Sequence, residues 1–399
     1  MHFSLPRIEM KSQRVFSIDA MRGITIFVMI FVNELAGVSG LPAWMKHADA
    51  DADAMTFVDV VFPGFLFIVG MSIPFAITRR LEKGDSFAQL ASHILSRTIG
   101  LLILGVFMVN MEGGYNEDAM GMSIHLWALL FYVCVILVWN KYTFPDKEKS
   151  YFFRGAGMLG LIVLAIIYRR GEHGDEYLTP QWWGILGLIG WAYLFSTFIY
   201  LITRASIAVV AIAIVLCILA FALPVMAPEL SVFQILKGIG GHATHTSIVL
   251  AGILLTLIFL RGNPQQFKRR IIHAVLLAVV FAAAGFILRP YFGISKIYAT
   301  PPWALLSIAS CIGLFVMLYI ITDVTRRRSW TKVIQPAAAN PLLAYIIPSI
   351  IYHLMRTINL HWPAMFYKGL SGIVWAIVFS FLVMGVVIIL NKWKIKLQL

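Results

Sequence analysis

A short polar stretch between two long apolar runs gathers groups that can do acid–base chemistry. His47 is followed by Asp49, Asp51 and Asp53, and Asp59 stands where the second apolar run begins. A carboxylate that holds one ring nitrogen of a histidine fixes its tautomer and raises the basicity of the other nitrogen. Because both ends of this loop are held by apolar runs, His47 is predicted to act as a general base or as an acyl-accepting nucleophile.

The aspartates of this loop allow three interpretations. Alternating carboxylates are typical of the start of a calcium loop, but the glycine and the distal glutamate of such a loop are missing, and we expect no metal. Acids at the mouth of an apolar cleft attract a cation, so Asp49, Asp51, Asp53 and Asp59 are expected to bind a cationic substrate. A loop that is simply solvated, His47 included, is the third interpretation.

The first apolar run carries polar residues of its own. Polar and ionisable groups are costly inside a bilayer, so Arg22, Asn33 and Glu34 are functional candidates by default. Asn33 follows Arg22 by about three helical turns, which predicts that it lies near the outer end of the helix and within reach of His47. We assign Glu34 to substrate binding. The plainer alternatives are an Arg22 side chain that snorkels to the interface and an Asn33 that bonds a neighbouring helix.

The composition is that of a polytopic membrane protein. Of 399 residues, 60% are hydrophobic and 13% are charged, with a mean hydropathy of +0.84. Soluble domains are roughly half apolar and about a quarter charged. The net charge of +13 is explained by basic residues in cytoplasmic loops, so we expect a lipid bilayer around the chain and no nucleic acid. Because no long polar stretch interrupts the pattern, residues 1–399 are predicted to form a single transmembrane domain.

The apolar runs predict an all-α bundle of about 12 transmembrane helices, since a span needs about 20 apolar residues. The expected spans are Gly23–Leu41, Phe57–Ile77, Ile94–Val109, Ile124–Trp139, Gly155–Tyr168, Trp182–Ile202, Ser206–Met226, Thr246–Leu260, Ile271–Leu288, Trp303–Ile321, Pro341–Met355 and Gly369–Leu390. With the N-terminus inside, the inner loops hold about 22 lysines and arginines and the outer loops about 8, which satisfies the positive-inside rule. Both termini are therefore predicted to be cytoplasmic and the His47 loop to face outward. The absence of an apolar segment before Arg14 argues against a cleavable signal peptide.

The first two runs carry a recognisable pattern. It reads SIDAMRGITIFVMIFVN, then KHA, then TFVDVVFPGFLFIVGMSI. This pattern, over roughly residues 14–80, resembles the heparan-α-glucosaminide N-acetyltransferase family and its bacterial relatives associated with N-acetylglucosamine use. The resemblance is weaker in later spans. It implies that His47 takes the place of the catalytic histidine and Asn33 that of a neighbouring asparagine, and that Asp19, Arg22 and Asp59 fall on motif positions.

The resemblance implies an acetyltransferase of the bacterial inner membrane. Acetyl-CoA, held from the cytosolic side, would give its acetyl group to the amine of a small amino sugar at the outer face. The coenzyme is strongly anionic, so we expect Arg22, Arg79, Arg80 and Arg97 to bind it. His47 would accept the acetyl group or deprotonate the amine, and Asn33 would donate to the oxyanion. A homodimer is compatible with the sequence.

The alternative is a transporter for N-acetylglucosamine or a related sugar. Twelve spans with both ends inside are a common transporter layout, and aromatic residues on the outer side can stack on a sugar. Transporters often contain an internal repeat, and none is visible here. The one-sided His47 loop and this missing repeat favour the enzyme.

Overall fold

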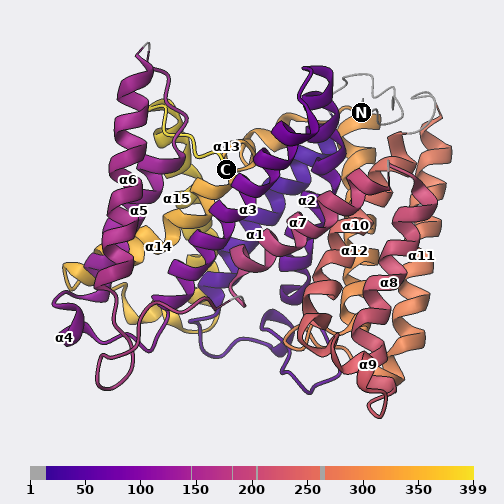
Figure 1. The fold of residues 1–399 in the computed structure, drawn as a ribbon, viewed down its shortest axis with the longest axis horizontal. Coiled ribbons are helices and arrows are strands. Elements are labelled where there is room, and N and C mark those ends of the chain that lie inside the picture. Colours follow the sequence, from indigo (N-terminus) through magenta and orange to yellow (C-terminus); the bar gives the residue numbers. More distant parts are fainter. Residues whose placement is uncertain (1–14, 145, 182, 204, 261–265) are drawn as a thin grey trace. The chain divides into compact units, whose positions relative to one another are not determined.

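The structure is a computed structural model that describes residues 15–144, 146–181, 183–203, 205–260 and 266–399 (Figure 1). These residues form helices joined by loops, with isolated β-bridges and no strand. The helices of at least 16 residues are α1 (Phe16–Leu35), α2 (Val58–Glu82), α3 (Phe87–Asn110), α5 (Ile124–Trp139), α6 (Lys147–Ile167), α7 (Ile185–Ile202), α8 (Ile207–Met226), α10 (Gly240–Leu260), α11 (Phe267–Phe292), α12 (Pro301–Tyr319), α14 (Pro341–Thr357) and α15 (Gly369–Lys392). The short helices are α4 (Glu117–Met120), α9 (Ser231–Gln234) and α13 (Gln335–Ala339).

The all-α membrane bundle is confirmed. Within the described ranges, ten helices are long and apolar enough to cross a membrane. The helices α5 and α14 also coincide with expected spans, but they have only 16 and 17 residues. The number of spans and the side on which the termini lie stay predictions. Five basic residues counted for the inner loops lie outside the described residues: Arg7, Lys11, Arg14, Arg204 and Arg261.

Helices α1, α3, α6 and α10 begin six to eight residues before the apolar windows that predicted them, and the cause is visible for α1 and α3. The first begins at Phe16 instead of Gly23, because the Asp323 carboxylate accepts the backbone N–H groups of Phe16 and Ser17 at 3.1 and 2.8 Å. A carboxylate at this position satisfies free donors and complements the helix dipole. The same helix ends at Leu35, six residues before the expected Leu41.

The start of α3 is set by a capping box. The backbone N–H of Gln89 donates to Ser86 Oγ at 3.3 Å, and the Gln89 side chain accepts the backbone N–H of Ser86 at 2.7 Å. This reciprocal pair is a sequence-readable start signal. It places the start of the helix at Phe87, seven residues before the expected Ile94.

The chain divides into two compact units. Of the described residues, those within 15–25, 42–98 and 188–330 form the first unit, and those within 26–41, 99–187 and 331–399 form the second. Each unit is therefore assembled from segments far apart in the sequence. The single transmembrane domain stays a prediction.

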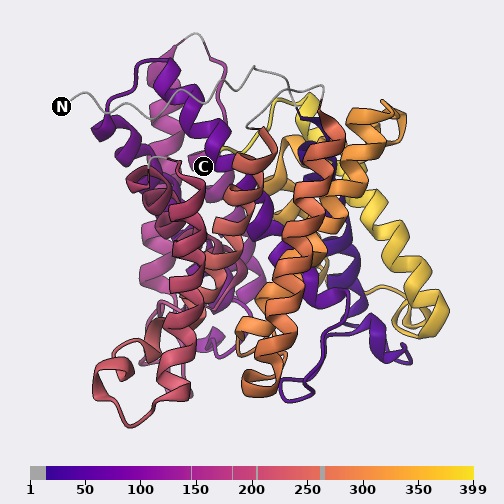
Figure 2. The same cartoon turned by 90° about the vertical axis from the view of Figure 1, so that its right-hand side faces the viewer.

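In the first unit, α2 packs against α10 at backbone distance. A Cβ atom on Gly70 would lie 1.9 Å from the carbonyl oxygen of Val249, and one on Gly252 would lie 2.1 Å from that of Phe67. Only glycine fits at both points, as is common where membrane helices approach closely. Figures 1 and 2 show the neighbouring helices α8, α10, α11 and α12 running alongside one another. This packing fixes α2, whose first turn carries Asp59.

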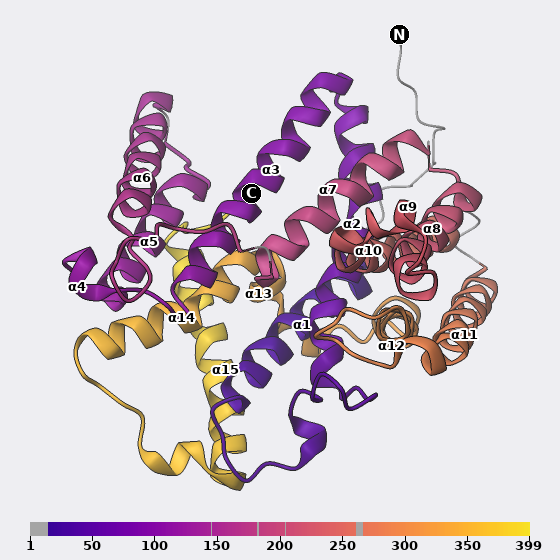
Figure 3. The same ribbon diagram turned by 60° about the horizontal axis from the view of Figure 1, so that its bottom comes forward.

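In the second unit, α5 packs beside α6 and also contacts α14 (Figure 3). The Trp127 and Phe131 rings of α5 are fully buried and stack with Phe107 of α3 at centroid distances of 5.4 and 4.9 Å. The indole of Trp127 donates to the backbone carbonyl of Leu164 in α6 at 3.0 Å. Aromatic packing thus forms the core of this unit.

Candidate functional site

His47 and Asp59 form a tight pair at the start of α2. Nδ1 of His47 lies 2.6 Å from Oδ1 of Asp59. The other oxygen, Oδ2, accepts the backbone N–H groups of Ala48 at 3.1 Å and Thr56 at 3.0 Å. Asp59 is 1% exposed, whereas the His47 side chain is 48% exposed. Since the carboxylate accepts at Nδ1–H, the neutral imidazole keeps its lone pair on Nε2, where a reagent can reach it.

The loop before α2 folds back on itself to bring this pair together. Thr56 Oγ1 donates to the backbone carbonyl of Lys46 at 2.7 Å and accepts the backbone N–H of Val58 at 3.2 Å. Asp59 lies in the first turn of the helix, where free N–H groups and the helix dipole favour a carboxylate. Short-range bonds thus close the loop that carries His47.

Lys296 is the third ionisable group at this site. Its Nζ lies 3.3 Å from Nδ1 and 3.3 Å from Nε2 of His47. Burial lowers the pKa of the Lys296 ammonium, and the Asp59 carboxylate partly offsets this effect. The ammonium therefore gives up its proton at a lower pH than an exposed lysine does.

The loop that carries Lys296 is tied to the His47 loop by Asp53. The Asp53 carboxylate accepts the backbone N–H of Ile294 at 2.7 Å and Nε of Arg289 at 3.0 Å. The bond from Ile294, followed by that from Arg289, lowers the pKa of Asp53. Asp53 also adopts a positive φ of 44°, a conformation that Asp tolerates better than most residues. We expected Asp53 to bind substrate; the structure engages its carboxylate within the protein.

Beneath Asp59 lies a buried aromatic layer. Nε1 of Trp303 donates to the backbone carbonyl of Asp59 at 3.2 Å, and Trp303 is 0% exposed. His245 of α10 packs edge-on against Trp303 and against Phe62, with centroid distances of 5.8 and 5.4 Å. This layer supports the first turn of α2 from the protein interior.

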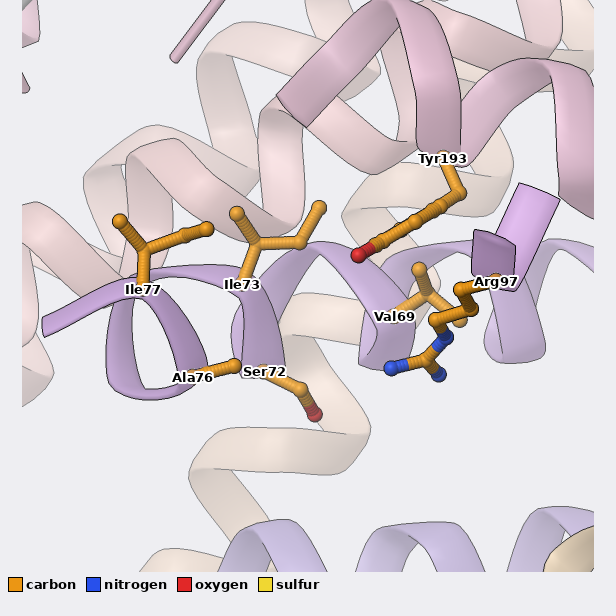
Figure 4. A pocket seen from close by; sticks show the side chains of 7 residues that line it. All are labelled: Val69, Ser72, Ile73, Ala76, Ile77, Arg97 and Tyr193. Carbon is orange, nitrogen blue, oxygen red and sulfur yellow. The ribbon is translucent and has the colours of Figure 1, made fainter. Parts of the chain in front are cut away.

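Further along α2, Arg97 and Ser72 line one pocket (Figure 4). The lining residues are Val69, Ser72, Ile73, Ala76, Ile77, Arg97 and Tyr193. The Arg97 guanidinium lies over the Tyr193 ring, 4.8 Å from its centroid, and its Nε is buried without a hydrogen-bond partner among the described residues. Arg22 donates to Ser72 Oγ at 2.9 Å and to Asp19 at 3.2 Å. Arg97 thus lines the same pocket as Ser72, the serine to which Arg22 donates, and two guanidinium groups near one pocket suit an anion.

The remaining two arginines of the expected coenzyme site lie at the end of α2. Arg80 is paired with Asp85 at 2.6 Å, and Arg79 is exposed. Neither lines the pocket of Ser72 and Arg97. Their assignment to coenzyme binding stays a prediction.

The other candidates from the sequence fall into two groups. In the first unit, Asp49 and Asp51 are exposed beside His47 in the chain, whereas Asn33 is exposed and belongs to the second unit. In the second unit, Glu34 is held by its neighbours: its Oε1 accepts the Tyr352 hydroxyl at 2.5 Å and the Trp375 indole at 2.9 Å. A carboxylate engaged by two donors is held in one orientation.

No metal centre is apparent in the part of the chain that the structure describes. No group of three or more His, Cys, Asp or Glu side chains is placed to hold an ion there. The expected absence of a metal stays a prediction.

The sequence did not link Lys296 or Trp303 to His47 and Asp59. They lie more than two hundred positions after His47, in a segment that carries no charge pattern comparable to the aspartate loop. The one available signal was topological, because the segment RPYFGISKIYATPPW falls on the same predicted side of the membrane as His47. Sidedness alone selects no residue within it.

Comparison with known proteins decides the family. The sequence profile described as "Domain of unknown function (DUF5009)" matches residues 14–236, more than half of the chain. The chain belongs to the DUF5009 family. It is also 36% identical over 105 residues to heparan-alpha-glucosaminide N-acetyltransferase of Homo sapiens, and 35% identical over 100 residues to that of Mus musculus.

These two relatives match only in part. The matches cover 26% and 25% of this chain, and 15% and 14% of the relatives' own lengths. They confirm the resemblance found in the sequence pattern. The DUF5009 match includes His47, Asp59 and Arg97 but ends before Lys296 and Trp303, so the structure adds these two residues to the site.

Proposed function

We propose that this DUF5009 protein is a membrane-embedded acetyltransferase that moves an acetyl group from acetyl-CoA to the amine of an amino sugar of the glucosamine type. The observation that carries the proposal is the His47–Asp59 pair, in which a half-exposed imidazole is held by a fully bonded, buried carboxylate. The names of the two curated relatives supply the class of reaction.

The pair suits either of two routes. An amine attacks an acyl carbon only as the free base, and Nε2 of His47 can take its proton. Alternatively, Nε2 attacks the thioester itself and carries the acetyl group to the amine. In both routes Asp59 keeps the ring in one tautomer and stabilises the imidazolium or acyl-imidazole that forms.

The anionic end of the coenzyme is assigned to Arg22 and Arg97, with Arg79 and Arg80 as further candidates at the end of α2. The buried Nε of Arg97 that lacks a hydrogen-bond partner fits an incoming anion, because a polar group in that state is costly. Ser72 follows Asp59 by 13 positions (72 minus 59), about 20 Å along α2 at 1.5 Å per residue. The long pantetheine arm would bridge that interval and deliver the acetyl group to His47.

The acceptor is assigned to the acidic loop. Asp49 and Asp51 are exposed close to His47 in the chain and attract a protonated amino sugar. Asp53 serves this loop indirectly by binding Arg289. Glu34 and Asn33 remain assigned to substrate binding and to oxyanion donation from the sequence pattern. The proposed location is the inner membrane of a bacterium, with the His47 loop outside.

Purified protein in detergent provides the test. Wild type should acetylate glucosamine with acetyl-CoA, and His47→Gln should fold normally but lose at least about 100-fold in kcat. Near-normal turnover in that variant would remove His47 from the mechanism. Uptake of labelled N-acetylglucosamine into proteoliposomes without acetyl-CoA, together with no acetylation, would identify a transporter instead.

A further inference from the structure

We propose that the Lys296 ammonium is a catalytic group of the His47 site, where it stabilises the negative charge on the acyl oxygen during transfer at Nε2. This inference rests on the proposed acyl transfer and adds a residue that lies outside the DUF5009 match. It is carried by the position of the ammonium relative to the ring.

The ammonium lies over the face of the imidazole. Its Nζ is equally distant, at 3.3 Å, from Nδ1 and Nε2 of His47. In the ring plane, a point so close to both nitrogens would overlap the carbon between them. The ammonium therefore lies above or below the plane, and the in-plane lone pair of Nε2 stays available for bond formation.

The ammonium of Lys296 lies close to where negative charge develops on the acyl oxygen. When a nucleophile adds to a thioester carbonyl, its lone pair bonds to carbon and the C=O electron pair moves onto oxygen. When this pair returns, the C–S bond breaks, and the departing thiolate takes up the proton that the acceptor amine gives up. If Nε2 is the nucleophile, the tetrahedral carbon holds its oxygen out of the ring plane, on the side of the ammonium. Lys296 keeps its own proton throughout.

The loop of Lys296 is built to hold this position. At its start, the backbone N–H of Ile294 binds the Asp53 carboxylate. Thr300 Oγ1 closes the turn by donating to the backbone carbonyl of Gly293 at 2.9 Å and accepting the backbone N–H of Ser295 at 3.0 Å. A donor fixed before the reaction stabilises a transition state without reorganising.

The charges around Lys296 favour an ammonium that acts on a new anion. Asp59 faces it, but that carboxylate is already bonded to His47, Ala48 and Thr56. The nearby Arg289 is occupied by Asp53. Lys296 is therefore the cation placed to meet charge that forms at Nε2.

The titration of Lys296 then limits the reaction at high pH. Because burial lowers its pKa, the ammonium is lost below the usual lysine value of about 10.4. Acyl transfer should therefore fall at high pH as Lys296 loses its proton. Lys296→Arg, which stays protonated, should remove the falling limb.

The test uses an acyl reagent, so that it needs neither coenzyme nor sugar. Diethyl pyrocarbonate acylates a neutral imidazole through the same kind of tetrahedral oxyanion. Between pH 6 and 10, the rate of carbethoxylation at His47 is followed by mass spectrometry of its peptide. Lys296→Met and Lys296→Gln should slow this rate by about tenfold or more, whereas Lys296→Arg should retain it. An unchanged or faster rate in the uncharged variants would overturn the proposal.

Two controls separate this effect from unrelated changes. Lys237→Met removes an exposed lysine and should leave the His47 rate unchanged, and carbethoxylation of the exposed His173 should be equal in all variants. If the uncharged Lys296 variants slow carbethoxylation of His47 but wild type does not acetylate glucosamine, the proposed function is wrong and the role of Lys296 stands. Full kcat for glucosamine acetylation in Lys296→Met would refute the role of Lys296 alone.

Discussion

Nδ1 of His47 lies 2.6 Å from Oδ1 of Asp59, and this carboxylate has no oxygen left unbonded. The pair joins an exposed ring to one of the most buried acids of the first unit. A carboxylate in this position orients the imidazole and fixes its tautomer.

Asp59→Asn should therefore lower kcat for glucosamine acetylation by about 100-fold or more. The amide can still hydrogen-bond His47, but its NH₂ group donates to the ring and selects the wrong tautomer. The matched control is Asp175→Asn, which neutralises an exposed acid of the second unit and should keep wild-type kcat. A kcat for Asp59→Asn within a few-fold of wild type would show that tautomer control is unimportant here.

The exposed acids should act on substrate capture. Asp49→Asn combined with Asp51→Asn should raise KM for glucosamine more than it lowers kcat, because exposed charges attract the cation without touching the reacting atoms. Added salt should raise the wild-type KM and narrow its gap to the variant, since the Debye length is about 8 Å at physiological ionic strength. If EDTA abolishes activity and a divalent ion restores it, a metal site replaces this explanation.

Asp53 should contribute to stability only where it is ionised. Its pKa is lowered in the folded protein, so its contribution is complete above the unfolded value of about 3.9 and is lost as pH falls through the lower folded value. Asp53→Asn keeps the backbone conformation and should lower Tm by about 2 °C or less at pH 7. That difference should stay constant down to about pH 5 and shrink below about pH 4. A difference that grows towards low pH would contradict the assigned ion pair with Arg289.

The orientation of the His47 loop can be tested by labelling. After replacement of Cys134, Cys217 and Cys311, Ala52→Cys should react with an impermeant thiol reagent in intact cells, and Ser329→Cys should react only after lysis. Both positions are exposed, so accessibility of the side chain does not limit the reaction. The reverse pattern would overturn the topology derived from the positive-inside rule.

The glycine contact between α2 and α10 should be intolerant of any side chain. Gly252→Ala places a methyl group 2.1 Å from the Phe67 carbonyl oxygen, so the helices must separate, and a large loss of Tm or of folded protein is expected. Gly313→Ala in α12, where an added Cβ meets nothing within 4 Å, is the matched control. Equal stability of both variants would rule out the close contact.

The sequence predicted the helices better than it predicted the partners of the site residues. Apolar length alone indicated a helix of at least 16 residues at each expected span, because a bilayer requires long apolar helices, but Ser86 and Gln89 were overlooked as a helix start. Proximity in the chain led to the association of His47 with Asp59. It led equally to the grouping of Asp53 with the substrate site, and it could not indicate Arg289, Lys296 or Trp303, because those contacts depend on tertiary packing.

The contact of Gly70 and Gly252 with the opposite backbones also limits how the first unit can move. A slide of α2 along α10 would bring residues with side chains to points that admit only hydrogen atoms, so the two helices are locked in register. Asp59 and Ser72 both lie on α2, and they therefore travel together in any conformational change. Any motion of the first unit must therefore keep the distance between the Asp59 end of α2 and the pocket lined by Ser72 and Arg97 constant.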